Sequence, residues 1–386
     1  MKILFTFWVV LLCLTGAQVF AADAKDISSI ESFDLDSKVL GEKRHILVHL
    51  PQSYAKGQSR FPVLYLTDAE TQMLHTSGTV DFLARANSMP EMVVVGITHS
   101  DRMHDLTPTH STGPMEKTSG GADKFLQFLE EELIPTINQR YRTAPYKVFA
   151  GHSLGGLFAI HTYLSHPKTF DAYIAVSPSL WWDGRLLLNR AEAAFAERKA
   201  EGTVFLALGD EGKLMQEPFD RFKAILEKAA GPDLHLSTQA FDDENHVSVV
   251  LRAHYQGLKQ VFNGWREPRD ITFQQMQEHY AAWSKRLGYS IIVPEQSANG
   301  LGYSLMEQDK FDEAIAVMAW NTRTYPASAN TYDSLCEVLT NAAKLAEAKT
   351  LCEKAVDVAQ ASNDPLFSEF KQHLVDLNAR ILKKGQ

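Results

Sequence analysis

The stretch KVFAGHSLGG, residues 147–156, places Ser153 at the centre of a Gly-x-Ser-x-Gly pentapeptide. A run of strand character, 147–150, leads into the pentapeptide, and an apolar run of helical character, 157–164, follows it. A serine on a sharp turn between a strand and a helix presents its hydroxyl to a reactant. The pattern therefore predicts that Ser153 is a nucleophile on a strained turn.

The residues around Ser153 fit this interpretation. Gly151 and Gly155 have no side chain that would collide with the neighbouring backbone of so tight a turn. The first N–H groups of a helix have no partner within the helix, so the amide of Leu154 can face the oxyanion that forms when Ser153 attacks a carbonyl. We expect the nucleophile and one oxyanion donor to be adjacent residues.

Apolar runs typical of buried strands recur along the chain and alternate with helical patterns, of which 123–141 is the clearest. Such alternation predicts a mostly parallel sheet covered by helices on both faces. Ligand sites in such sheets form at the carboxyl ends of strands, which is where Ser153 lies. The fold class expected is α/β, an α/β-hydrolase fold. The strand-like runs are 44–51, 63–70, 92–98, 146–151, 172–177 and 203–209.

A serine hydroxyl needs a base to take its proton, and a carboxylate to hold that base in the right tautomer. In this fold the partners follow in the order serine, acid, histidine. Of the histidines after Ser153, His246 differs from the rest because it follows an alternating run, 234–241, in the acidic loop FDDENH and precedes a helical run that begins at Val247. The position favours His246 as the base over a surface histidine without function.

The acid is expected after the strand-like run TVFLALG, 203–209, where Asp210 and Glu211 come next. Either carboxylate could orient the base, and either could instead cap the helix that begins near Lys213. We select Glu211, and Asp210 stays the alternative.

Length and composition exclude some classes of function. The 386 residues are enough for one large domain and a smaller one. The net charge of -9 gives no reason to expect a nucleic-acid partner. No cluster of histidine and cysteine has the spacing of metal ligands, so neither a metal nor a cofactor is expected.

Residues 1–21 have the pattern of a secretory signal peptide. Lys2 precedes an apolar run, 3–14, that is too short to span a membrane, and Val19 and Ala21 supply the small residues before a cleavage site. Cys13 lacks the small preceding residues of a lipoprotein anchor. The sequence predicts an exported protein, periplasmic or secreted, without a membrane anchor.

Five separated motifs, taken in order, resemble one family, the putative esterases, which include esterase D, the enterochelin esterases and the periplasmic siderophore trilactone hydrolases. The resemblance covers about residues 34–264. The motifs are FDLDSKVLGEKRHILVHLPQSY (33–54), RFPVLYLTDAE (60–70), GHSLGG (151–156), SPSLWWDG (177–184) and ENHVSV (244–249).

This resemblance implies a serine carboxylic-ester hydrolase that works through an acyl-enzyme. It implies Ser153 as nucleophile, His246 as base and a carboxylate of the segment GDEG as the acid. It also implies that the loop after Leu66, around Asp68 and Ala69, supplies the second oxyanion amide. Family members often have glycine after the histidine, whereas this chain has Val247.

Three residues are candidates for contact with the substrate. Trp181 and Trp182 follow a strand at the same sheet edge as Ser153, and they form either an aromatic wall for an acyl or aryl group or part of the core. Arg102 lies in the loop after the third strand-like run.

The charges near the predicted site bear on the substrate. A siderophore trilactone loaded with iron is anionic and would need several cations around the pocket mouth. The candidate loops hold few cations, and three carboxylates lie beside His246. We therefore expect a neutral or modestly polar small-molecule ester, with a siderophore trilactone as the alternative. The cations are Arg102, Arg185 and Lys213; the carboxylates are those of Asp242, Asp243 and Glu244.

The chain after residue 265 has helical patterns only, and a period of 34 relates Leu301 to Leu335 and Ala314 to Ala348. This spacing is that of a tetratricopeptide repeat. The predicted domains are therefore 22–265, the esterase, and 266–386, a small helical domain. That domain is either a structural appendage or a surface for a protein partner, and a rival interpretation of the whole chain is a non-catalytic binding protein that uses it.

Cys336 and Cys352 take the places that Gly302 and Met318 have one period earlier, so they are expected on facing helices. They either form a disulfide, as exported proteins permit, or are two small buried core residues.

Overall fold

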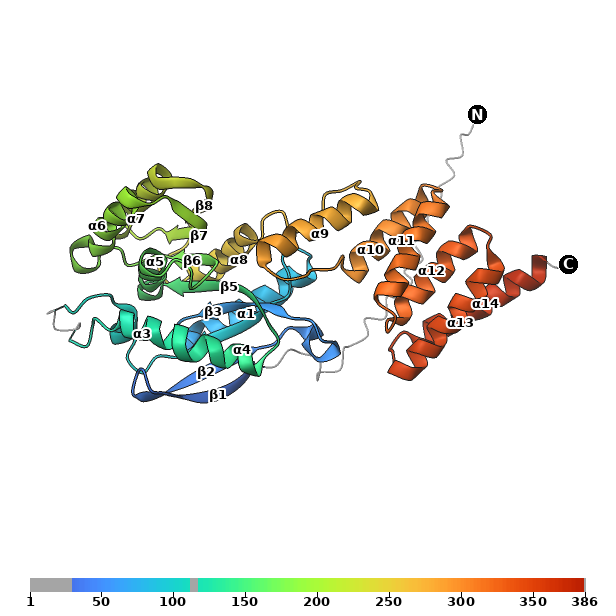
Figure 1. Cartoon of the computed structure of the whole chain (residues 1–386), viewed down its shortest axis with the longest axis horizontal. Coiled ribbons are helices and arrows are strands. Elements are labelled where there is room, and N and C mark those ends of the chain that lie inside the picture. The colour runs from blue at the N-terminus through green and yellow to red at the C-terminus, as the bar shows by residue number, and fades with distance from the viewer. Residues whose placement is uncertain (1–29, 112–116, 385–386) are drawn as a thin grey trace, which may run out of the picture. The chain divides into compact units, whose positions relative to one another are not determined.

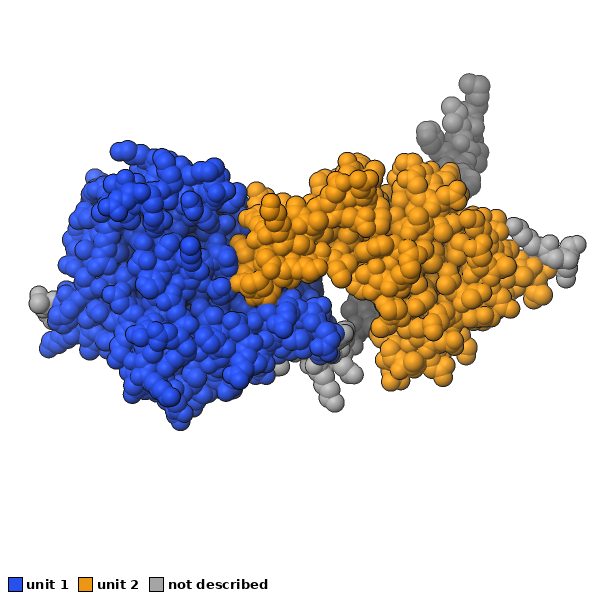
Figure 2. Space-filling model, in the orientation of Figure 1, with its two compact units in different colours: residues 1–143, 147–261 blue, residues 144–146, 262–386 orange. Residues whose placement is uncertain are grey.

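A computed structural model describes residues 30–111 and 117–384, so the predicted signal peptide, 1–21, lies outside the described residues. The chain forms two compact units (Figure 2). Unit 1 comprises the described residues up to Thr143 and from Lys147 to Val261, and unit 2 comprises Ala144–Tyr146 and the chain from Phe262. Within the described residues, no helix has the length and apolar composition needed to cross a bilayer.

Unit 1 is built on one eight-stranded sheet with the order β1-β2-β4-β3-β5-β6-β7-β8 (Figure 1). The pairs β1–β2 and β2–β4 are antiparallel, and every other neighbouring pair is parallel. The predicted fold class, α/β with a mostly parallel sheet, is confirmed. The strands are β1 (Ile30–Ser37), β2 (Glu42–His49), β3 (Phe61–Leu66), β4 (Val93–Ile97), β5 (Thr143–His152), β6 (Ala172–Val176), β7 (Ala200–Gly209) and β8 (Ala230–Phe241).

Helices cover the sheet and connect its strands. The predicted helix at 123–141 is a continuous run of α3, η3 and α4, in which η3 is a single π-helical segment. The helices are α1 (Ala69–Arg85), α2 (Arg102–Leu106), α3 (Ala122–Phe128), η3 (Leu129–Leu133), α4 (Ile134–Arg140), α5 (Leu154–Ser165), α6 (Trp182–Glu197), α7 (Lys213–Ala229) and α8 (Val249–Val261), with a short 3₁₀ turn, η2 (Gln52–Lys56), after β2.

Alternate residues of the central strands pack against different helices. Phe149 of β5 packs against Phe158 of α5, with ring centroids 5.5 Å apart. Gly257 of α8 lies so close to β6 that a Cβ there would be 2.9 Å from a methyl group of Ile174. Burial on both faces explains why these strands appear in the sequence as continuous apolar runs rather than as alternating ones.

The helix expected to begin at Val247 begins two residues later, at Val249. The side-chain oxygen of Asn245 accepts the N–H groups of Val247, at 2.9 Å, and of Ser248, at 3.0 Å. An asparagine that bonds the backbone two residues on forms a turn of its own, and this turn delays the helix.

Unit 2 contains helices and, among its described residues after Phe262, no strand, and its helices repeat with a period of 34. Helix α12 begins 34 residues after α10, and α13 begins 34 residues after α11. The all-helical C-terminal region is confirmed, while its assignment to the tetratricopeptide repeats stays a prediction. The helices are α9 (Phe273–Leu287), α10 (Glu295–Glu307), α11 (Phe311–Thr324), α12 (Ala329–Asn341), α13 (Leu345–Ser362) and α14 (Phe367–Lys384).

The pairs α10–α11 and α12–α13 each have a close contact between their two helices at the equivalent position, but the residues that make it differ. In the first pair, a Cβ at Gly302 would be only 2.5 Å from the terminal methyl group of Met318, so the helices approach closely there. In the second pair, the equivalent residues, Cys336 and Cys352, form a disulfide with their Cα atoms 5.4 Å apart. Of the two alternatives left open by the sequence, the structure contains the disulfide.

A buried ion pair fixes the loop that carries α2. Arg44 of β2 donates from Nη1 to Oδ2 of Asp105 at 2.6 Å, and the two side chains are 1% and 3% exposed. Nδ1 of His99 lies 2.8 Å from the same oxygen. Burial acts to raise the pKa of Asp105, but the bonds from His99 and Arg44 outweigh it, and the pKa is lowered.

We predict that Asp105→Asn lowers the free energy of unfolding by about 3 kcal/mol, because it removes the buried carboxylate partner of Arg44 and leaves that charge only the pair with Glu42, whose side chain is 38% exposed. Since the folded-state pKa of Asp105 is depressed, the contribution is present above the ordinary aspartate pKa of 3.8 and declines as the pH falls below it. Urea unfolding at several pH values measures both effects. Asp34→Asn is the control, because its pair with His45 is about half exposed; equal losses for the two variants would contradict the prediction.

Candidate active site

Ser153 lies between the last residue of β5 and the first of α5, with φ 59° and ψ −112°. A positive φ is strained for a residue with a side chain. A Cβ at Gly151 would be 2.2 Å from the carbonyl oxygen of Gly155, so that position excludes any larger residue, as predicted. A Cβ at Gly155 would be 2.4 Å from the side-chain oxygen of Thr67, so the predicted collision involves a side chain rather than backbone.

The structure brings Ser153, His246 and Glu211 together. Nε2 of His246 lies 3.0 Å from Oγ of Ser153, and Nδ1 of His246 lies 2.5 Å from Oε2 of Glu211. When Nδ1 carries the proton and donates to the carboxylate, Nε2 is free to accept the serine proton. The side chain of His246 is 39% exposed, so a substrate can reach it.

Glu211, rather than Asp210, faces the base. Its side chain is 4% exposed, and Oε1 accepts bonds from the Ser177 hydroxyl and, at 3.1 Å, from the Gly209 N–H. Burial acts to raise the pKa of Glu211, but the bonds from His246 and Ser177 outweigh it and lower the pKa. Asp210 is exposed, and its N–H donates to the carbonyl of Glu244 at 2.8 Å.

The two residues predicted to supply oxyanion amides begin the helices that follow two neighbouring strands. Leu154 is the first residue of α5, and Ala69 is the first residue of α1. These helices follow β5 and β3, which pair in parallel up to Ala150 and Leu66. Because N–H groups of a first turn have no acceptor in their own helix, both amides are suited to bind an anion. Their roles stay predictions.

Arg102 is held within the site. Its Nε donates to Oδ1 of Asp68 at 2.5 Å, and its Nη2 donates to Oδ2 of Asp68 and to the carbonyl of His152, both at 3.0 Å. The guanidinium thereby connects the loop after β4 with the loop before α1 and with the end of β5. Its contact with a substrate stays a prediction.

The two tryptophans differ in exposure. Trp182 is 2% exposed, and its Nε1 donates to the hydroxyl of Thr109 at 3.0 Å, which makes it part of the core. Trp181 is only partly buried, so it is the one of the pair with ring surface left for a ligand.

Sequence reasoning missed three residues near the nucleophile. Ser177 holds Glu211, Oγ of Ser179 lies 3.3 Å from Oγ of Ser153, and Nε2 of His152 lies 2.6 Å from the carbonyl of His246. The segment SPS directly follows β6 at the carboxyl edge of the sheet, which was the signal for both serines.

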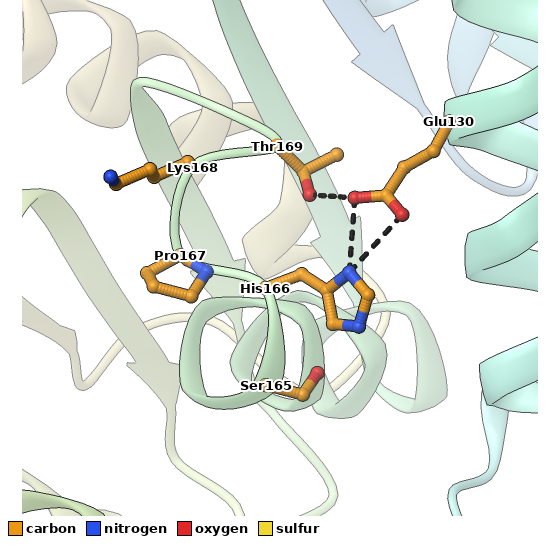
Figure 3. Close-up of a pocket in the computed structure, with 6 residues that line it drawn as sticks. All are labelled: Glu130, Ser165, His166, Pro167, Lys168 and Thr169. Carbon is orange, nitrogen blue, oxygen red and sulfur yellow. Dashed lines mark hydrogen bonds and ion pairs between the residues drawn. The ribbon is translucent and has the colours of Figure 1, made fainter.

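A surface pocket lies at the other end of α5, after Ser165 (Figure 3). Its lining includes Glu130, whose carboxylate contacts Nδ1 of His166 at 3.1 Å and the Thr169 hydroxyl. A helix of this length separates its two ends by about 18 Å. The pocket is therefore distinct from the arrangement around Ser153.

Comparison with known proteins supports an ester hydrolase. The model of a family described as "Putative esterase" matches residues 37–255, more than half of the chain. A siderophore triacetylfusarinine C esterase of Aspergillus fumigatus is 26% identical over 54% of this chain and 84% of its own length. The ferri-bacillibactin esterase BesA of Bacillus subtilis is 28% identical over 53% of this chain and 80% of its own.

The solved structures include a similar protein. An IroE-like serine hydrolase from Shewanella oneidensis is 27% identical, with a TM-score of 0.69 over 77% of this chain and all of its own length.

The neighbouring carboxylates allow a matched test of the acid. We predict that Glu211→Gln lowers kcat for a p-nitrophenyl ester by roughly 10²–10⁴-fold, because an amide no longer holds His246 in the required tautomer. Asp210→Asn, which changes the adjacent exposed carboxylate in the same way, should leave kcat within about threefold of the parent. Steady-state kinetics measures both variants; the reverse order would move the role to Asp210.

Proposed function

Because this chain belongs to the putative esterase family and is a carboxylic-ester hydrolase, we propose that it cleaves its substrate through an acyl-enzyme formed on Ser153. The observation that carries the proposal is the continuous series of contacts from Oγ of Ser153 to His246 and on to Glu211. A hydroxyl, an imidazole and a carboxylate in this order are the groups that a serine nucleophile requires.

The proposed reaction has two steps. Ser153 adds to the ester carbonyl while His246 takes its proton, the amides of Leu154 and Ala69 stabilise the oxyanion, and the alcohol leaves with the proton from His246. Water then adds to the acyl-enzyme, with His246 again accepting a proton, and the acid is released as Ser153 regains its hydrogen. Glu211 stabilises the imidazolium in both steps.

The distribution of charge favours a neutral or modestly polar ester. Three arginines in or near the site loops already contact carboxylates: Arg102 with Asp68, Arg185 with Glu217, and Arg252 with Asp243 and Glu244. Using them for an anionic substrate would break those pairs. Trp181 offers an aromatic surface for an acyl or aryl group.

A siderophore trilactone is the second candidate substrate. The names of the relatives favour it, since one of the two esterases named above is a siderophore triacetylfusarinine C esterase and the other is a ferri-bacillibactin esterase.

We further propose that the protein is exported. Residues 1–21 have the pattern of a signal peptide, and the disulfide between Cys336 and Cys352 is of the kind that persists in oxidising compartments.

The nucleophile can be tested directly. We predict that Ser153→Ala lowers kcat by a factor on the order of 10⁴ or more and removes the initial burst of p-nitrophenol from p-nitrophenyl acetate. Ser179→Ala is the control, because its hydroxyl is near that of Ser153 and the variant keeps the Ser153–His246 contact. Turnover by Ser153→Ala within about tenfold of the parent would reject the nucleophile.

The two candidate substrate classes can be distinguished by which one has the higher kcat/KM. We predict that short-chain aryl esters react at least about tenfold faster, by kcat/KM, than a ferric catecholate trilactone, because the arginines near the site already have carboxylate partners. Parallel assays at one pH and one ionic strength make the comparison. A clear preference for the trilactone would place the protein with the siderophore hydrolases.

A further inference from the structure

We propose that His152 is a positioning residue that holds the His246 loop against the end of β5, and this inference rests on the proposed function. His152 is the last residue of β5 and immediately precedes Ser153. Its Nε2–H donates to the backbone carbonyl of His246 at 2.6 Å, and the two imidazole rings have centroids 4.6 Å apart. One short segment therefore carries the nucleophile and also binds the loop of the base.

The bond to the carbonyl leaves the His246 ring free for the reaction. Nδ1 of that ring contacts Glu211, and Nε2 contacts Ser153, so both ring nitrogens are used in the contacts proposed for the reaction, and the bond from His152 goes to the backbone instead. The next residue, Val247, is 75% exposed and gives the loop little packing. The hydrogen bond from His152 therefore holds the loop at the backbone of His246 itself.

His152 is held firmly enough to act as an anchor. It belongs to β5, which has parallel neighbours on both sides, and its own carbonyl accepts the Nη2–H of Arg102 at 3.0 Å. The side chain is thus directed by a fixed backbone, while the loop that it holds begins only after β8 ends at Phe241.

The charge state of His152 suits this role. Burial, followed by the proximity of His246, lowers the pKa of His152 to about 4. Asp68, which acts to raise this pKa, and Arg102, which acts to lower it, are the charged groups nearby, and His254 is itself kept neutral by burial, which lowers its pKa to about 3. A neutral imidazole donates the bond without placing a positive charge beside the imidazolium that forms on His246.

Two variants separate a hydrogen-bonding role from simple packing. His152→Met has a side chain of similar length without a donor, whereas His152→Gln keeps an N–H in a similar place. We expect His152→Met to lower kcat for p-nitrophenyl acetate by about 10–100-fold with KM changed by less than about twofold, and His152→Gln to recover kcat to within about fivefold of the parent. His254→Met is the control, because it removes a nearby buried histidine whose Nδ1 bonds the Thr76 hydroxyl and which, among the described residues, makes no hydrogen bond to His246.

The outcomes decide the proposal. A loss of kcat in His152→Met that His152→Gln restores, with kcat of His254→Met near that of the parent, supports it. Unchanged kcat in His152→Met, equal losses in His152→Met and His152→Gln, or an equal loss in His254→Met would overturn it. Those results leave the proposed function intact, since only a turnover retained by Ser153→Ala contradicts that function.

Discussion

The close backbone approach between Gly151 and Gly155 is the constraint on which the site depends. With a Cβ at Gly151 only 2.2 Å from the Gly155 carbonyl oxygen, the chain can turn from β5 into α5 there only because Gly151 lacks a side chain, and Gly155 lacks one where Thr67 packs against it. Gly156 extends the tight packing, since a Cβ there would be 2.9 Å from the carbonyl of Val176 in β6. The turn forces Ser153 to a positive φ, which costs about 1–3 kcal/mol and persists because the buried strand and helix on either side determine it.

The arrangement of strands brings residues far apart in sequence to one edge. Five adjacent parallel strands end at this edge, and each is followed by a residue of the candidate site. Because neighbouring parallel strands end side by side, a separation of 93 residues between Ser153 and His246 becomes a contact of 3.0 Å. The groups are Ala69 after β3, Ser153 after β5, Ser177 after β6, Glu211 after β7 and His246 after β8.

The sequence predicts features that depend on a local pattern of residues. It does not predict contacts that depend on the direction of single side chains. The strand before Ser153 and the helix after it are periodic patterns, and the acidic loop marked His246. The choice between Asp210 and Glu211 depends on which way each side chain points at the end of β7, and one residue of difference reverses that direction. The bonds from Ser177 to Glu211, from His152 to His246 and from Arg102 to Asp68 each join segments far apart in the sequence, so no local pattern could predict them.

The electrostatics of the candidate site favour the proposed transfer of a proton from Ser153 to His246. This transfer creates an imidazolium, so a negative charge beside His246 helps it and a positive charge hinders it. Glu211 supplies the negative charge, because its lowered pKa keeps it ionised at neutral pH. The nearby cation, Arg102, is paired with Asp68, and burial keeps His152 and His254 neutral. At neutral pH the proposed base, His246, therefore contacts an ionised carboxylate and has no uncompensated positive charge from Arg102, His152 or His254 beside it.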